Sequence, residues 1–127
     1  MKKTSVLAVS IALFFTICIQ STAMAGTFLQ CGNLMYEIDY ENRTVTRDSE
    51  LYTEDGHRLG DFINTVKRMD DSYIELESKS TNTGWTLGYS INRKTGMQVF
   101  SNIKPNGEEG KHSGESVSCT KIVGNKF

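Results

Sequence analysis

The sequence predicts a small, mostly β fold: an antiparallel meander that closes into a barrel or sandwich and is held by one disulfide. Three observations predict it. Several segments alternate apolar and polar residues with period two, as half-buried strands do. Turn-forming residues separate these segments at intervals of about 8–12 residues, which is typical of all-β folds. An even number of cysteines follows the N-terminal leader, as expected for a disulfide-linked exported domain.

Residues 1–25 have the three parts of a cleavable export signal. A positive start at Lys2 and Lys3 precedes an apolar run over residues 6–19, and the small-x-small pattern of residues 23–25 follows. As a helix this run would span only about 21 Å, less than the roughly 30 Å of a bilayer core. Such an opening is typical of a bacterial leader. We therefore expect one small β domain over residues 26–127, periplasmic or secreted, without a membrane anchor after cleavage.

The composition excludes nucleic-acid binding and disorder. The whole chain holds 14 basic and 15 acidic residues. Removing Lys2 and Lys3 leaves 12 basic and 15 acidic residues, a net charge of −3. This is not the basic surplus that follows a phosphate backbone. Apolar residues at 38% and charged residues at 23% are ordinary for a globular domain.

The first predicted strands form a hairpin. Apolar residues alternate with polar ones over residues 34–40, which indicates a strand with one buried face. Residues 41–43 supply a turn, and residues 44–47 can return as the partner strand. Residues 48–56 are polar, and we expect a loop or a short edge strand there.

The segment 59–69 allows two interpretations. Its five large apolar residues follow the spacing of a helical stripe: Leu59, Phe62, Ile63, Val66 and Met69. However, residues 63–66 are weak helix formers, and the segment contains no alanine. We predict a hairpin of residues 62–69 against residues 72–78. The alternative is an α+β fold with a short helix near 59–69.

The clearest alternation has four large apolar residues on one face: Trp85, Leu87, Tyr89 and Ile91. The turn at 92–96 ends in a glycine, which suits a left-handed conformation. Residues 97–103 then form the return strand. Residues 104–115 contain the single proline and three glycines, which predicts a long exposed loop. Residues 116–123 supply the closing strand.

The two cysteines of the mature chain predict a structural disulfide. Cleavage would remove Cys18 and leave Cys31 and Cys119, which are 88 residues apart and allow one pairing. A zinc site would need four ligands, and neither His57 nor His112 stands at metal-motif spacing from a cysteine. No Cys-x-x-Cys motif indicates redox chemistry. We expect no metal and no cofactor.

An acidic segment is the strongest indication of a binding function. Residues 37–61 hold eight acidic residues and three arginines, a local charge of −5. An acidic surface can steer a basic partner toward the protein, although it also serves simply as a soluble sheet edge. We expect a non-enzymatic binding module with a protein partner, such as an inhibitor or immunity protein for a basic envelope-targeting enzyme like a lysozyme. The candidate partner-binding residues are Glu37, Asp39, Glu41, Glu50, Glu54, Asp55 and Trp85.

Two alternative functions stay open. The polar loop 81–84 leads into Trp85, and an aromatic ring beside amide and hydroxyl groups suits a glycan or peptidoglycan-binding module. A lone tryptophan that heads a strand is more often part of the core. A small hydrolase would have to use His112 or His57, the only imidazoles in the chain. Neither lies in a nucleophile motif, so we expect no enzyme.

The leader generates the first testable prediction. Export from a bacterial host should yield a chain that begins at Gly26, because signal peptidase requires small residues at the positions occupied by Ala23 and Ala25. N-terminal sequencing and intact mass measurement of the exported protein check it. A mature chain that still begins at Met1, or one that carries a lipid on Cys18, would contradict the prediction.

Overall fold

Ten antiparallel strands and no helix make up residues 26–122, the part of the chain that the computed structural model describes. The strands are β1 Thr27–Cys31, β2 Leu34–Asp39, β3 Thr44–Arg47, β4 Glu50–Tyr52, β5 His57–Leu59, β6 Phe62–Met69, β7 Tyr73–Ser80, β8 Thr86–Asn92, β9 Met97–Ile103 and β10 Ser116–Ile122. The predicted meander is confirmed. Over these residues the structure holds no helix of the length and apolar character needed to cross a membrane.

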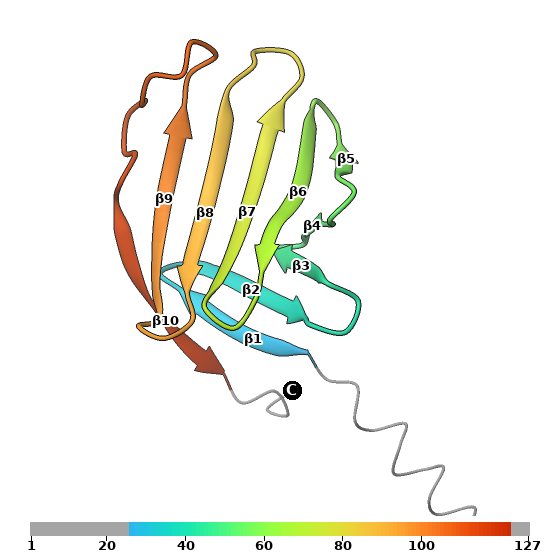
Figure 1. The fold of residues 1–127 in the computed structure, drawn as a ribbon, viewed down its shortest axis with the longest axis vertical. Coiled ribbons are helices and arrows are strands. Elements are labelled where there is room, and N and C mark those ends of the chain that lie inside the picture. Colours follow the sequence, from blue (N-terminus) through green and yellow to red (C-terminus); the bar gives the residue numbers. More distant parts are fainter. Residues whose placement is uncertain (1–25, 123–127) are drawn as a thin grey trace, which may run out of the picture.

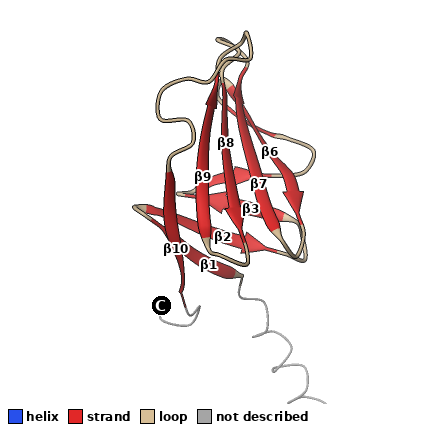
Figure 2. Cartoon of the chain, turned by 60° about the vertical axis from the view of Figure 1, so that its left-hand side comes forward, coloured by secondary structure: helices blue, strands red, loops and turns tan. Residues whose placement is uncertain are grey.

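The strands form one sheet in the order β4-β3-β2-β1-β10-β9-β8-β7-β6-β5. The first strand, β1, therefore pairs with the last, β10. Figure 1 shows β1–β3 crossing below the long strands β6–β9, and Figure 2 shows the two halves from the side. At the far edges the chain after β4 meets β6, where the Val66 N–H donates to the Thr53 carbonyl at 2.8 Å. The sheet is thus nearly closed into a barrel.

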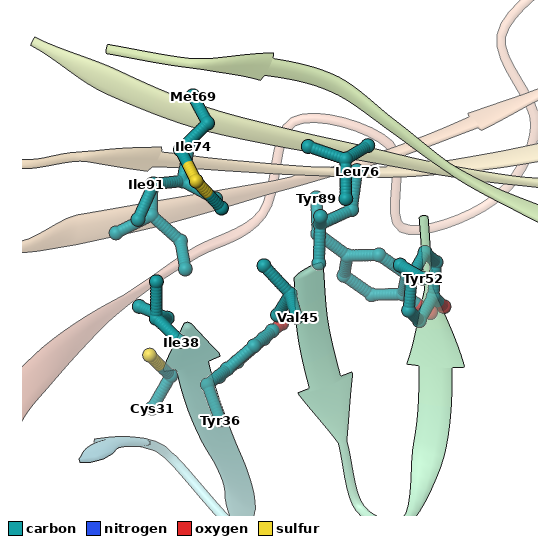
Figure 3. Close-up of a cluster of buried hydrophobic side chains, with 11 residues drawn as sticks. Cys31, Tyr36, Ile38, Val45, Tyr52, Met69, Ile74, Leu76, Tyr89 and Ile91 are labelled. Atoms are coloured by element: carbon teal, nitrogen blue, oxygen red, sulfur yellow. The ribbon is translucent and has the colours of Figure 1, made fainter. Parts of the chain in front are cut away.

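The core lies between the two halves of this sheet. Figure 3 shows side chains of β2, β3 and β4 pointing toward those of β7 and β8. Burying one such side chain contributes about 1.5–3 kcal/mol. The inward positions alternate along each strand, as the period-two pattern predicts. The buried hydrophobic residues are Cys31, Tyr36, Ile38, Val45, Tyr52, Val66, Met69, Ile74, Leu76, Tyr89 and Ile91.

A cluster of tyrosines inside the core holds one arginine. The guanidinium of Arg47 lies over the Tyr89 ring at 4.2 Å and donates from Nε to the Tyr52 hydroxyl at 3.3 Å. Glu50 accepts a further hydrogen bond from Arg47 at 3.1 Å. Burial raises the pKa of Tyr36 and of Tyr89, because a buried phenolate would lose its hydration. Tyr36 and Tyr89 therefore stay neutral, while Arg47 stays charged and paired.

Two buried amides are also hydrogen-bonded. The Tyr36 hydroxyl donates to the side-chain oxygen of Gln98. The Ser78 hydroxyl donates to Asn64 Oδ1 at 2.7 Å, and Asn64 Nδ2 donates to the Leu51 carbonyl at 3.3 Å. Unpaired, each buried amide would cost about 1–3 kcal/mol, so these contacts select the register in which they form.

Residues 59–69 hold the end of β5, a two-residue turn and β6, and the helix near 59–69 is excluded. Residues 62–69 are β6, which pairs with β7 along its length, and the predicted hairpin is confirmed. The register shifts between Val66 and Arg68, so a β-bulge adds one residue at Lys67. Because of this bulge, both Val66 and Met69 point into the core although they are three residues apart. The bulge accounts for the three-residue spacing of Val66 and Met69 in the helix-like pattern, whereas Leu59, Phe62 and Ile63 are exposed.

The disulfide joins the first strand to the last. Cys31 on β1 lies directly opposite Cys119 on β10, and the two are bonded, as predicted. Disulfides persist in oxidising, extracytoplasmic compartments. Residues 1–25, where the leader is expected, lie outside the described residues, and export stays a prediction.

Removing the disulfide should destabilise the fold strongly. The bond closes a separation of 88 residues. In the chain-entropy model, removing this constraint from the unfolded chain lowers the free energy of unfolding by about 4–5 kcal/mol. The double variant Cys31→Ser, Cys119→Ser should therefore lose free energy of unfolding on this scale in a denaturant titration. Reduction of the unmodified protein is the matched control and should give the same loss. A change below about 1 kcal/mol in both would show that β1–β10 pairing holds without the bond.

Candidate functional site

The outer face of β1–β4 carries apolar and acidic side chains side by side. Phe28 on β1 lies opposite Glu37 on β2, and Glu37 lies opposite Thr46 on β3. Thr46 lies opposite Leu51 on β4. The residues two positions before and after Glu37 share its face, because side chains alternate along a strand. We call this surface the acidic face and define it as Phe28, Met35, Glu37, Asp39, Thr46, Asp48 and Leu51.

A shallow hollow of about 290 Å³ lies in the acidic face. Glu37 and Asp48 are exposed there, while the apolar residues of the face are half-buried. The hollow therefore offers an apolar floor beside two carboxylates. Its lining residues are Phe28, Met35, Glu37, Thr46, Asp48 and Ser49.

Asp48 is held by the tight turn between β3 and β4. The turn has two residues, Asp48 at φ 46° and Ser49 at φ 73°. Two positive φ values are typical of a type I′ hairpin turn, whose twist matches that of the strands. Asp48 Oδ1 accepts a hydrogen bond from the Met35 N–H at 2.9 Å. The turn thus places a carboxylate at a defined position beside β2.

Asp39 is also held in place at the end of β2. Its carboxylate accepts hydrogen bonds from the Asn42 backbone N–H at 3.0 Å and from the Asn42 side chain at 2.8 Å. These bonds to Asn42 lower the pKa of Asp39, because they stabilise the ionised form. Asp39 therefore keeps its charge in more acidic solution than a free aspartate does.

No lysine or arginine opposes these carboxylates on the acidic face, as far as residues 26–122 are concerned. β1, β2 and β4 contain neither residue type. Arg47, the one arginine of β3, points into the core, where it contacts Tyr52 and Tyr89. Lys121 on β10 lies opposite Leu29, an inward residue of β1. The face consequently has one sign of charge.

The other predicted acidic residues do not join this face. Glu50 is bonded to Arg47 at 3.1 Å, and Glu54 is paired with Arg43 at 2.9 Å. The exposed Arg43–Glu54 pair contributes only about 0–1 kcal/mol, but both pairs reduce the local negative charge. The remaining two, Glu41 and Asp55, lie exposed in turns between strands. Of the six predicted carboxylates, Glu37 and Asp39 therefore lie on the acidic face.

Comparisons of the chain with protein-family models, with curated proteins and with solved structures found no match. The geometry of the described residues is therefore the basis for a functional assignment. Among these residues, no three metal-ligating side chains gather into a possible metal site.

Trp85 lies away from the acidic face. It directly precedes β8, and the loop between β7 and β8 lies at the end of the long strands that is remote from β1–β3 (Figure 1). A hollow of about 620 Å³ adjoins it. The loop backbone covers part of the indole, since a Cβ at Gly110 would lie 2.8 Å from the Trp85 ring. Within the described chain, the buried Asn102 Oδ1 has no hydrogen-bond partner.

The two histidines lie in exposed or edge positions. His112 Nδ1 is 2.5 Å from Glu115 Oε2, and both side chains are more than half exposed. Ser113 Oγ accepts a hydrogen bond from the Asn102 N–H at 3.2 Å, which ties it to strand β9. His57 begins the edge strand β5. Neither histidine shares the burial that tunes a general base, so the geometry gives little support to a hydrolase.

Sequence reasoning overlooked Asp48, Phe28, Met35 and Leu51 as site residues. Asp48 belonged to the acidic segment, but its position depends on the register of β3 against β4. The available signal was the two-residue turn at Asp48 and Ser49. This turn directly follows β3, so Asp48 lies beside Met35 on β2.

The strained turn generates a prediction. Ser49 has a left-handed backbone, which costs a non-glycine residue about 1–2 kcal/mol. Glycine avoids this steric cost, but it loses more conformational entropy on folding, which cancels part of the gain. Ser49→Gly should therefore raise the free energy of unfolding by about 0.5–1 kcal/mol, as measured by denaturant titration. Ser49→Val, a β-branched control at the same site, should lower it. Equal stabilities of the two variants would contradict the turn geometry that positions Asp48.

Proposed function

We propose that this protein is a non-enzymatic binding protein of the bacterial envelope that inhibits a basic cell-wall-degrading enzyme, such as a lysozyme, through the acidic face. One observation carries the proposal. Three carboxylates, Glu37, Asp39 and Asp48, surround an apolar centre, and no lysine or arginine among the described residues opposes them.

Electrostatics favours a basic partner on this face. A surface with one sign of charge steers an oppositely charged protein and raises its association rate. The hollow beside Glu37 and Asp48, about 290 Å³ in volume, can receive the end of a lysine or arginine side chain. A charge-assisted hydrogen bond to either carboxylate is roughly twice as strong as a neutral one.

The apolar centre supplies the remaining affinity. Phe28, Met35 and Leu51 are half-buried on this face and would lose their water contact against a partner. Apolar centres with a polar rim are typical of specific protein interfaces. The scaffold is also rigid, because the disulfide and the tight β3–β4 turn hold the face in place. A pre-organised surface loses little conformational entropy on binding.

Charge reversal on the acidic face tests the proposal. Oxidised wild-type protein should bind a basic lysozyme and slow its lysis of bacterial cell walls, and higher salt should weaken the binding, because salt screens exposed charges. Glu37→Lys should weaken binding at least about tenfold, equivalent to roughly 1.4 kcal/mol. Titration calorimetry and a turbidity assay measure the two effects.

Asp55→Lys is the matched control. It makes the same change in net charge at an exposed turn residue outside the acidic face, and it should leave the affinity within about threefold. Equal losses in the two variants would mean that only net charge matters. Absence of binding and inhibition at low salt would refute the inhibitor proposal. Retention on peptidoglycan that is abolished by Trp85→Ala would support the glycan-binding alternative instead.

A further inference from the structure

A second hollow opens on the inner side of the sheet, next to the disulfide. It has a volume of about 270 Å³. It lies where β1 and β10 meet the turn between β8 and β9, at the lower end of the barrel in Figure 1. We call it the inner hollow and define it by its lining: Thr27, Leu29, Tyr40, Ile74, Ile91, Asn92, Arg93, Gly96, Cys119 and Lys121.

The depth of the inner hollow is apolar. Ile74 and Ile91 form part of the buried core, and they lie behind its floor. Leu29 and the disulfide-bonded residue Cys119 add to the lining from the paired strands β1 and β10. Tyr40 is 38% exposed and adds an aromatic wall at the entrance. Such a surface gains from contact with an alkyl chain, which removes apolar area from water.

The entrance carries positive charge. Arg93 and Lys121 are both exposed there, and among residues 26–122 the lining includes no carboxylate. Arg93 is held in place, since its guanidinium lies over the Tyr40 ring at 4.6 Å and its Nη1 donates to the Asp70 carbonyl at 2.6 Å. The nearest acidic group is Asp71, 3.9 Å from Arg93 and fully exposed, so solvent screens this contact strongly. Arg93 Nε and Nη2 make no hydrogen bond within residues 26–122.

We propose that the inner hollow binds a medium-chain alkyl carboxylate. The alkyl tail lies against Leu29 and the disulfide, above the core residues. The carboxylate lies at the entrance, where Arg93 and Lys121 donate charge-assisted hydrogen bonds to it. The volume corresponds to about nine water-sized groups at roughly 30 Å³ each, which fits a chain of eight to ten carbons.

This inference goes beyond the proposed function and is independent of it. The acidic face lies on the outer side of β1–β4, whereas the inner hollow faces the barrel interior. The two surfaces also require ligands of opposite charge. A failure of one proposal therefore leaves the other intact.

Titration with sodium decanoate, below its micelle concentration, tests the inference. The protein is used in its oxidised form, purified from the periplasm of a host that expresses the full coding sequence. Calorimetry gives the affinity, and amide NMR shifts locate the site. Decanoate should bind at least about tenfold more tightly than decan-1-ol, which lacks the charge, and than butanoate, which lacks the tail. The largest shifts should fall at Arg93, Gly96 and Lys121. Equal binding of decanoate and decan-1-ol, no decanoate binding, or shifts elsewhere would overturn the inference.

A pair of charge-reversal variants completes the test. Lys121→Glu should weaken decanoate binding at least about tenfold, because it places a carboxylate beside the ligand headgroup. Lys79→Glu makes the same change in net charge at an exposed residue of β7 outside the inner hollow, and it should leave binding unchanged. Circular dichroism verifies that both variants keep the β fold. Equal affinities of the two variants for decanoate would refute the role of the entrance charge.

Discussion

The pairing of β1 with β10 is the contact on which the rest of this structure depends. Without it, the chain would hold two separate meanders, β1–β4 and β5–β9, each with one apolar face in water. The pairing joins the two meanders edge to edge and lets their apolar faces cover each other. Cys31 and Cys119 lie directly opposite in that pair, so their bond secures the longest-range contact of the fold. Such contacts are entropically the most costly for a chain to form.

Closure of the sheet also sorts the charges. Arg47 turns inward, where tyrosine rings and Glu50 satisfy it, and Lys121 faces the inner hollow. The carboxylates Glu37 and Asp48 are left on the outside, without a basic neighbour on their face among residues 26–122. The acidic face and the positively charged entrance are thus two consequences of one arrangement. Each strand sends alternate residues to opposite sides, and closure decides which side becomes the interior.

Much of the fold was predictable from local patterns. Alternation located the strands around Tyr36 and Tyr89. Cys31 and Cys119 are the two cysteines outside the predicted leader, and two cysteines allow only one bond. The segment around Val66 was ambiguous because a β-bulge at Lys67 disturbs the alternation and imitates a helical spacing. A bulge depends on the pairing of two strands, so the pattern of one strand does not reveal it.

The sequence by itself determined the mostly β class, the meander of hairpins and the disulfide, because turn residues, alternation and cysteine number act over short distances or leave one choice. Only the tertiary structure decided which carboxylates share a surface. Glu50 and Glu54 are as acidic as Glu37, yet arginines elsewhere in the chain neutralise them. Asp48 joins Glu37 through strand register, and the inner hollow requires Arg93, in the turn after β8, and Lys121, on β10, to line one surface. A charged residue's neighbours depend on strand pairing and closure, and these are properties of the whole fold.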